Sequence, residues 1–148
     1  MIKFLYIIYY RLHLIYCFLV RPKVRGSYCL IYVNDYLLII KNSYKADWTV
    51  PCGGINRGEE PIEAAVREVK EEVGINLEAQ QVNFIKVILN TTEYKKDYIH
   101  LFDYRMKSFP RVKIDDREVV DYKWIKVSDA KDFPLFHPIK KFLTNEGL

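Results

Sequence analysis

The chain has 148 residues, half of them hydrophobic, and a formal net charge of +4 at pH 7. This length supports one hydrophobic core and is too short for two ordinary domains, so one globular domain is expected. The basic residues are scattered in ones and twos, which argues against a dedicated nucleic-acid-binding face and predicts no specific nucleic-acid partner. Three cysteines without C-x-x-C spacing argue against a disulfide framework and a structural zinc site, and they fit a reducing cytoplasm.

The first predicted element is an apolar helix within residues 1–22. Its apolar run is interrupted by Arg11 and His13 and is shorter than the roughly 20 residues that a bilayer span needs, so no transmembrane segment is expected. Two alternatives stay open. The helix packs on the domain or on a second subunit of a homodimer, or it lies on a membrane surface and places a cytoplasmic protein at the membrane periphery. The apolar residues at helical spacing are Leu5, Ile8, Leu12, Ile15 and Leu19.

From residue 23 onward the pattern becomes that of a mixed sheet. A tight hairpin is predicted at Asn34-Asp35, and a closing helix at 137–145 has Pro138 in its first turn. One helix among strands, with another at each end of the chain, predicts an α/β fold with helices on both sides of a mixed sheet. The segments predicted as strands are 27–33, 36–41, 48–50, 82–90, 97–106 and 118–127.

The central helix is predicted from Pro61 to Val73. Its apolar residues recur at spacings of three and four and define one buried stripe. Proline suits the first turn of a helix, and Gly74 suits the residue just past the end. The helix is therefore expected to be amphipathic, with one side against the sheet.

Three glutamates of this helix, Glu68, Glu71 and Glu72, lie three and four residues apart, so their carboxylates converge on one side. A solvated acidic face is the simplest interpretation. The glycines Gly53 and Gly54 favour another, because a glycine loop can approach the helix closely and lend it a carbonyl oxygen. Clustered oxygen ligands without histidine or thiolate suit Mg²⁺ or Mn²⁺ better than Ca²⁺.

The spacing of these residues resembles a known signature. Gly53, then Glu59 after five residues, then REVKEEVGI at 67–75, is similar to a complete Nudix box over residues 53–75, the signature of the Nudix hydrolase superfamily. The strands before and after the box are similar to the family's usual layout. The resemblance implies a Nudix-like α/β/α sandwich over residues 23–148, with the N-terminal helix outside that core.

What the resemblance implies is a metal-dependent pyrophosphohydrolase that cleaves a diphosphate linkage in a nucleoside diphosphate joined to another group X. The substrate is then a small nucleotide, such as a nucleoside triphosphate or a nucleotide sugar. Bound metal neutralises the diphosphate and lowers the pKa of the attacking water. Two alternatives are a membrane-surface Nudix enzyme or adaptor, and a non-catalytic nucleotide- or RNA-binding module on the same fold.

Carried over from the family, the metal ligands are the Gly53 carbonyl and the carboxylates of Glu68, Glu71 and Glu72. Glu68 or Glu72 also serves as the base that takes a proton from water, with Glu68 preferred. Glu118, in the last predicted strand, matches a position where some members keep an extra metal ligand or base. A solvated strand residue is the alternative at that position.

The resemblance also implies that Glu59 and Arg67 form an ion pair, which holds the glycine loop against the helix and so supports catalysis. Substrate contacts are predicted at Trp48, Tyr94 and Lys96, because aromatic rings stack on nucleobases and a lysine meets phosphates. Each of these side chains has packing or surface exposure as its alternative role.

Overall fold

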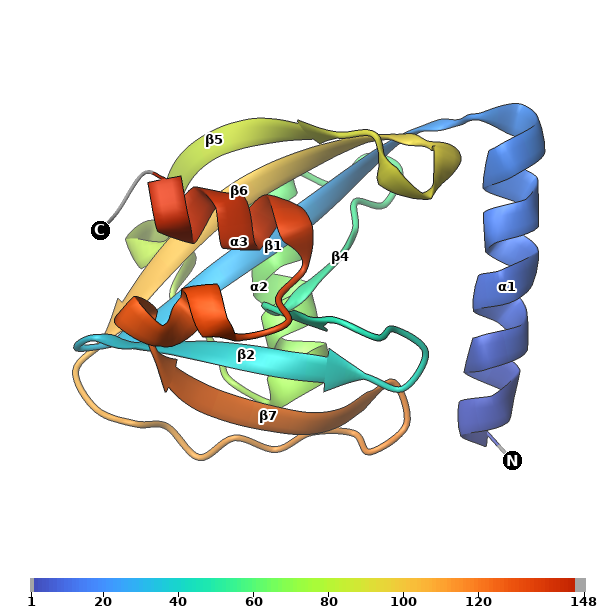
Figure 1. The fold of residues 1–148 in the computed structure, drawn as a ribbon. Coiled ribbons are helices and arrows are strands. Elements are labelled where there is room, and N and C mark those ends of the chain that lie inside the picture. Colours follow the sequence, from blue (N-terminus) through green and yellow to red (C-terminus); the bar gives the residue numbers. More distant parts are fainter. Residues whose placement is uncertain (1, 146–148) are drawn as a thin grey trace.

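A computed structural model describes residues 2–145 of the chain (Figure 1). Its α-helices are α1 (Ile2–Val20), α2 (Pro61–Val73) and α3 (His137–Asn145). Short 3-10 helices are η1 (Ala79–Gln81), η2 (Thr92–Tyr94) and η3 (Val127–Asp132). The strands are β1 (Lys23–Val33), β2 (Tyr36–Asn42), β3 (Trp48–Thr49), β4 (Cys52–Gly54), β5 (Asn83–Asn90), β6 (Lys96–Met106) and β7 (Val119–Lys126).

The seven strands form one mixed sheet in the order β3-β2-β1-β6-β5, with β4 paired to β1 and β7 paired to β2. β1 and β6 run parallel over their whole length, from Lys23 opposite Lys96 to Val33 opposite Met106. The other pairings are antiparallel. β4 lies where the sequence predicted a glycine loop, and its three residues pair with the first half of β1. That prediction was wrong because glycine is depleted in strands and β4 is very short.

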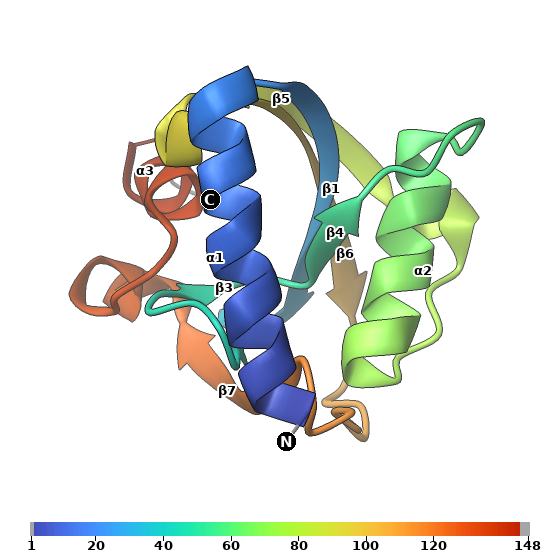
Figure 2. The ribbon, with the colours of Figure 1, turned by 90° about the vertical axis from the view of Figure 1, so that its right-hand side faces the viewer.

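Alternating residues of β1 contribute to two separate cores. Leu30 and Tyr32 belong to a cluster that includes residues of α3, whereas Cys29 and Ile31 belong to a cluster with residues of α2. Because both faces of the strand are buried, its sequence is a continuous apolar run instead of an alternating one. The predicted mixed sheet between helices is confirmed, with α2 and α3 on opposite sides (Figure 2).

The predicted N-terminal helix is confirmed as α1, which stands along one side of the molecule (Figures 1 and 2). None of the helices in residues 2–145 is long and apolar enough to cross a membrane. Rings of α1 lie against the domain: Tyr10 is 5.2 Å from Tyr44 between ring centroids, and Phe18 is 5.1 Å from Tyr94. Cys17 is fully buried. The division of the chain into residues 1–22 and 23–148 stays a prediction, and residues 1 and 146–148 lie outside the described part.

The face of α1 that packs on the domain is not the one that its apolar spacing indicated. Tyr6, Tyr10, His13 and Cys17 face inward and are buried or half-buried. The leucines and isoleucines of the predicted stripe are instead exposed, between 40% and 73% of their surface. The sequence could not distinguish the two faces because α1 carries apolar or aromatic residues on every side.

Candidate active site

α2 is fixed at both ends. At its start, the Glu63 carboxylate accepts a hydrogen bond from the Glu60 backbone N–H at 3.0 Å. The Ser27 hydroxyl of β1 donates to the Pro61 carbonyl oxygen at 2.7 Å and ties the first turn to the sheet. At its end, Gly74 adopts the left-handed conformation with φ of 70° and donates to the Lys70 carbonyl oxygen at 3.1 Å. These contacts fix the position of α2 relative to the sheet, and with it the positions of its side chains.

Gly53 permits the close approach of Glu68. A Cβ atom built on Gly53 would lie 2.1 Å from the Glu68 carboxyl carbon, so the carboxyl group at the end of that side chain would have to move away. At the adjacent Gly54, a built Cβ meets no heavy atom within 4 Å. The first glycine of the motif thus allows β4 and α2 to come together with the Glu68 carboxylate against the strand backbone.

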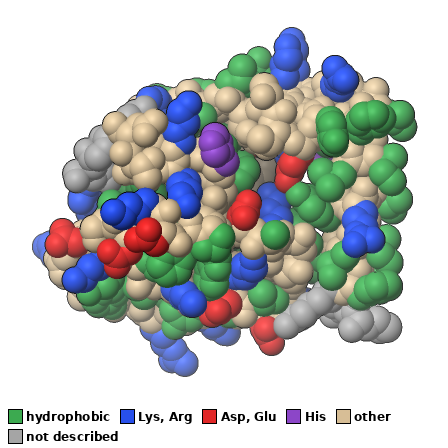
Figure 3. Space-filling view, viewed as in Figure 1, with side chains coloured by type: hydrophobic (Ala, Val, Ile, Leu, Met, Phe, Trp, Pro, Cys, Tyr) green, Lys and Arg blue, Asp and Glu red, His purple; other side chains and the backbone are tan. Residues whose placement is uncertain are grey.

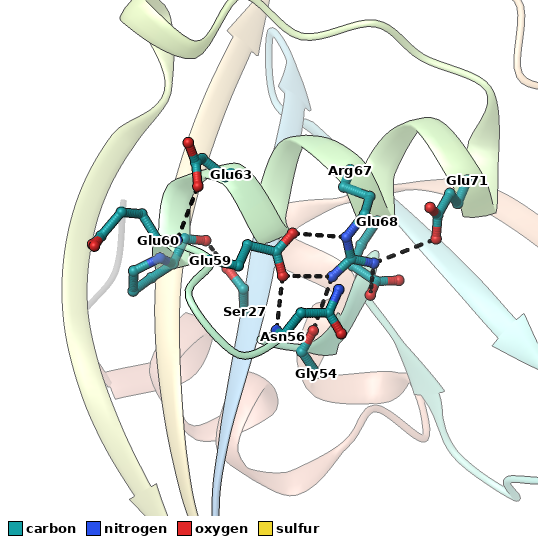
Figure 4. A network of polar contacts seen from close by, with 10 residues as sticks. Ser27, Gly54, Asn56, Glu59, Glu60, Glu63, Arg67, Glu68 and Glu71 are labelled. Atoms are coloured by element: carbon teal, nitrogen blue, oxygen red, sulfur yellow. Dashed lines mark hydrogen bonds and ion pairs between the residues drawn. The ribbon is translucent and has the colours of Figure 1, made fainter.

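The predicted ion pair between Glu59 and Arg67 is present (Figure 4). Nε and Nη2 of Arg67 donate to the two carboxylate oxygens of Glu59 at 2.8 and 3.0 Å, and Nη2 also donates to the Gly54 carbonyl at 3.0 Å. The backbone N–H of Asn56 donates to Glu59 at 2.8 Å. The hydrogen bonds from Arg67 and Asn56 lower the pKa of Glu59 to about 2. This network joins the loop after β4 to α2.

Arg67 also contacts the acidic side of the helix. Its Nη1 lies 2.5 Å from Glu68 Oε1 and 3.4 Å from Glu71 Oε2. Burial nevertheless raises the pKa of Glu68, because desolvation outweighs the attraction of the arginine. One guanidinium therefore does not fully compensate the carboxylates gathered on this side of α2.

Glu72 is the most deeply buried carboxylate of the set, with 6% of its surface exposed. Its Oε2 accepts a hydrogen bond from the Cys52 backbone N–H at 2.8 Å. Burial raises the pKa of Glu72 well above its usual value, and the negative charges of Glu68 and Glu118 add to this. A carboxyl group held in such a place needs a cation or a proton nearby.

A cavity of about 550 Å³ opens beside these carboxylates. Figure 3 shows the corresponding hollow between α1, on the right, and the rest of the molecule. Its acidic end is formed by α2 and β4. Its other walls come from β1, from the segment between β2 and β3, from the start of β6, and from the inner face of α1. The cavity is large enough for a small organic ligand.

The structure brings most of the predicted metal ligands to this cavity. Gly53, Glu68, Glu71 and Glu118 line it, while Glu72 lies behind β4 and does not. Glu118 precedes β7 instead of belonging to it, and its Oε1 accepts a hydrogen bond from the Tyr44 hydroxyl at 2.8 Å. Glu118 is therefore half-buried and faces the other carboxylates, unlike a solvated strand residue.

The predicted substrate contacts lie away from the cavity walls. Trp48 packs on the core cluster next to α3, with Lys123 above its ring. Tyr94 is 56% exposed and touches Phe18 of α1. Lys96 is exposed at the start of β6. Their contact with substrate stays a prediction.

The cavity residues that sequence reasoning missed include Tyr10, Tyr44, Lys45 and Asp97. They come from segments far apart in the chain, so no local motif connects them. One weak signal existed: residues two apart in a strand share a face, which puts Lys95 and Asp97 on the side opposite Lys96. That alternation does not say which face borders a cavity.

The donor set fits a hard divalent cation, since it consists of carboxylate oxygens and one backbone carbonyl. The raised pKa values of Glu68 and Glu72 point the same way, because nearby positive charge would relieve both. As the side chains lie, no group of three His, Cys, Asp or Glu within residues 2–145 is arranged to hold a metal ion. Arg67 contacts Glu68 and Glu71 there, so a cation would compete with its guanidinium.

Comparison with known proteins identifies a family. The model of the NUDIX domain matches residues 22–145. Nudix hydrolase 8 of Arabidopsis thaliana is 31% identical over 111 residues, which are 72% of this chain and 30% of the relative. An RNA pyrophosphohydrolase of a Nitratiruptor species is 25% identical over 130 residues, 76% of this chain and 84% of the relative. The chain therefore spans about a third of the plant relative's length.

Among solved structures, the MutT protein from Methanosarcina mazei Go1 is similar with a TM-score of 0.73. The match covers 84% of this chain and 92% of that chain, at 22% sequence identity. At this identity the likeness concerns the fold, and it agrees with the mixed sheet between helices described above.

Proposed function

The chain belongs to the Nudix hydrolase family, and from that premise we propose that it is a metal-dependent pyrophosphohydrolase acting on a small nucleotide. The bond that is cleaved is a diphosphate linkage in a nucleoside diphosphate joined to a group X, as in a nucleoside triphosphate or a nucleotide sugar. The observation that carries this proposal is the meeting of Gly53, Glu68, Glu71 and Glu118 at one end of a cavity of nucleotide size.

The residues that would hold Mg²⁺ or Mn²⁺ are Gly53 through its carbonyl, with Glu68, Glu71, Glu72 and Glu118 through their carboxylates. When bound, the ion supplies charge neutralisation of the diphosphate and a more acidic attacking water. These residues would offer the ion oxygen atoms only. Glu72 stays in place through its hydrogen bond from Cys52.

Glu68 is the preferred base, with Glu72 as the alternative. The Glu68 carboxylate lies at the cavity wall, where it can reach a water that attacks a bound diphosphate. The Glu59–Arg67 pair positions the loop and Glu68, and neither residue lines the cavity. Lys45, from the segment between β2 and β3, supplies positive charge for the phosphates.

A nucleotide is favoured over a nucleic acid by the shape of the site. α1 bounds one side of the cavity, so a ligand binds in a hollow of limited width between α1 and the rest of the molecule. One similar protein is named an RNA pyrophosphohydrolase, and the 5′ end of an RNA remains a second substrate class for the same chemistry. The scattered basic residues offer such a chain no extended electrostatic surface.

The test is release of phosphate or pyrophosphate from nucleoside triphosphates, nucleotide sugars, ADP-ribose, dinucleoside polyphosphates and 5′-triphosphorylated RNA, with Mg²⁺, with Mn²⁺ and with a chelator. Turnover of a nucleotide that needs metal and collapses in Glu72→Gln supports the proposal. Glu78→Gln, in an exposed loop, is the matched control. Binding of these nucleotides without turnover would instead indicate the non-catalytic module.

A second proposal concerns where the enzyme works, and it rests on the exposed side of α1. This face is apolar (Figure 3) and α1 contains no acidic residue, while Arg11, Arg21 and Lys23 lie in or next to it. Such a helix suits the surface of an anionic membrane at the cytoplasmic side. Apolar residues of α1 that are at least 40% exposed include Phe4, Leu5, Ile8, Leu12, Ile15, Phe18, Leu19 and Val20.

Sedimentation with anionic vesicles tests this localisation. The full chain is expected to sediment with vesicles containing phosphatidylserine, and Leu12→Lys to stay in the supernatant. Arg111→Lys, outside α1, serves as the control. If the protein does not sediment with vesicles but forms a dimer that Leu12→Lys disrupts, the exposed face of α1 is covered by a second copy of the chain instead.

A further inference from the structure

Asp97 is a buried carboxylate in the cavity wall that the proposed chemistry does not use. It is the second residue of β6, only 5% of its surface is exposed, and it lines the cavity. Within the described part of the chain, its Oδ1 has no hydrogen-bond partner. Burial raises the pKa of Asp97, as expected for a carboxylate with too few donors around it. A buried acceptor without a partner is costly unless a ligand supplies one.

Neighbouring residues hold Asp97 in a defined orientation. Lys95 Nζ is 3.7 Å from Asp97 Oδ2 and 3.1 Å from Glu93 Oε2. Glu93 in turn accepts a hydrogen bond from the Tyr10 hydroxyl of α1. One oxygen of Asp97 therefore faces the lysine, and the other is buried without a partner in a residue that lines the cavity.

The backbone at Gly26 locates Oδ1 relative to the acidic end of the cavity. A Cβ atom built on Gly26 would lie 3.5 Å from Asp97 Oδ1 and 3.6 Å from the Gly53 carbonyl oxygen. The Tyr28 ring is nearer still, with its Cε2 at 3.1 Å, so there is no free room at that position itself. The two oxygens nevertheless lie close to one another on either side of Gly26, which lines the cavity. A ligand group that reaches Asp97 Oδ1 therefore lies next to whatever Gly53 binds.

The chemistry of that group follows from its two neighbours. A phosphate has no hydrogen to donate and is repelled by a carboxylate, so it does not suit Asp97. With the diphosphate at Gly53, the next part of a nucleotide is its sugar. A sugar hydroxyl donates to a carboxylate, and an acidic side chain serves this purpose for ribose in dinucleotide-binding folds.

We propose that Asp97 accepts a hydrogen bond from a ribose hydroxyl and makes the site select ribonucleotides over deoxyribonucleotides. The inference rests on the proposed function, because it places the diphosphate beside Gly53. A deoxynucleotide leaves the Asp97 oxygen buried and unpaired, and such a loss discriminates strongly between substrates. Asp97 is thus a specificity-determining residue and not part of the hydrolytic chemistry.

The experiment is equilibrium binding, by titration calorimetry with Mg²⁺, of AMP, 2′-deoxy-AMP and 3′-deoxy-AMP, and of GMP and 2′-deoxy-GMP. Wild type is expected to bind the ribonucleotide of at least one base more tightly than a deoxy counterpart by about tenfold or more. Asp97→Asn, which keeps the size of the side chain, is expected to reduce that ratio to below about twofold. Asp103→Asn, on the same strand but outside the cavity, should keep it.

Two results would overturn the inference. Equal binding of the ribo and deoxy forms by wild type does so without any variant. An Asp97→Asn protein that weakens both forms equally assigns Asp97 a structural role. Because binding is measured apart from turnover, a protein that prefers ribonucleotides but hydrolyses none refutes the proposed function only, and hydrolysis without sugar preference refutes this inference only.

Discussion

Helices α1 and α2 border the same cavity but are held in place by different forces. α2 is capped at both ends, its apolar stripe is buried in the core, and Arg67 ties it to the loop after β4. α1 rests on the domain through aromatic rings and through the hydrogen bond from Tyr10 to Glu93, and several of its large apolar side chains are exposed.

The difference suggests a division of roles across the cavity. Chemistry that depends on atomic positions belongs on the rigid wall, where α2 and β4 hold the carboxylates. The wall formed by α1 carries tyrosines that contact Tyr44 and Lys45. This wall is held less firmly than the α2 wall, and it suits binding of the substrate. Changes in α2 should then act on turnover, and changes in α1 on affinity.

The largest effect is expected from Gly53→Ala. Its new Cβ would overlap the Glu68 carboxyl group, so either Glu68 or β4 must move. A displacement of about 1 Å in an active site costs roughly 100-fold in rate, and kcat is expected to fall accordingly. Gly54→Ala is the control, because a Cβ there meets nothing within 4 Å. Equal loss in both variants would show that the loop, and not Glu68, is responsible.

A smaller loss is expected from Arg67→Lys. Lysine keeps the charge but cannot donate to both oxygens of Glu59 and to Gly54 at once. Residues that orient metal ligands typically contribute about tenfold or more to activity, so kcat/KM at saturating Mg²⁺ should drop by about tenfold. Arg57→Lys, in the exposed part of the same loop, should be silent. Unchanged activity in Arg67→Lys would mean that charge alone is sufficient.

On the other wall, Tyr10→Ala should raise KM by about fivefold and leave kcat within about twofold, since one aromatic contact contributes about 1 kcal/mol. Tyr10 touches Tyr44 and Glu93, and both line the cavity. Steady-state kinetics checks this, with Tyr16→Ala on the exposed side of α1 as control. A fall in kcat with constant KM would contradict the proposal that α1 acts on affinity and α2 on turnover.

The ends of the two helices offer a comparison of stability. Gly74→Ala places a side chain at φ of 70° and close to the Lys113 carbonyl, so the free energy of unfolding should drop by about 1–2 kcal/mol. α1 already ends in a left-handed non-glycine residue, Arg21, with φ of 50°. Arg21→Gly relieves that strain but adds freedom to the unfolded chain, and the change should stay below about 1 kcal/mol. Urea denaturation followed by tryptophan fluorescence measures both.

How far the sequence predicted the molecule depends on how local each interaction is. The ends of α2 at Pro61 and Gly74 and the acidic side of the helix arise within the contiguous segment 53–75, so residue types and spacing were sufficient to predict them. The Glu59–Arg67 pair lies in the same segment and followed from its resemblance to the Nudix box. The position of Asp97 beside Gly53 depends on the pairing of β1 with β4 and β6, which no local pattern encodes. For α1, the apolar run was sufficient to predict a helix. Because apolar residues lie on all sides of it, the sequence did not indicate which face packs on the domain.

The measurement that tests the account most directly is kcat of Glu68→Gln against Glu78→Gln, on the best nucleotide substrate with saturating Mg²⁺. The account predicts that Glu68→Gln lowers kcat by about 100-fold or more, as loss of a general base and metal ligand should, while Glu78→Gln equals wild type. A folded Glu68→Gln protein with wild-type kcat would contradict the assignment of hydrolysis to the α2 wall.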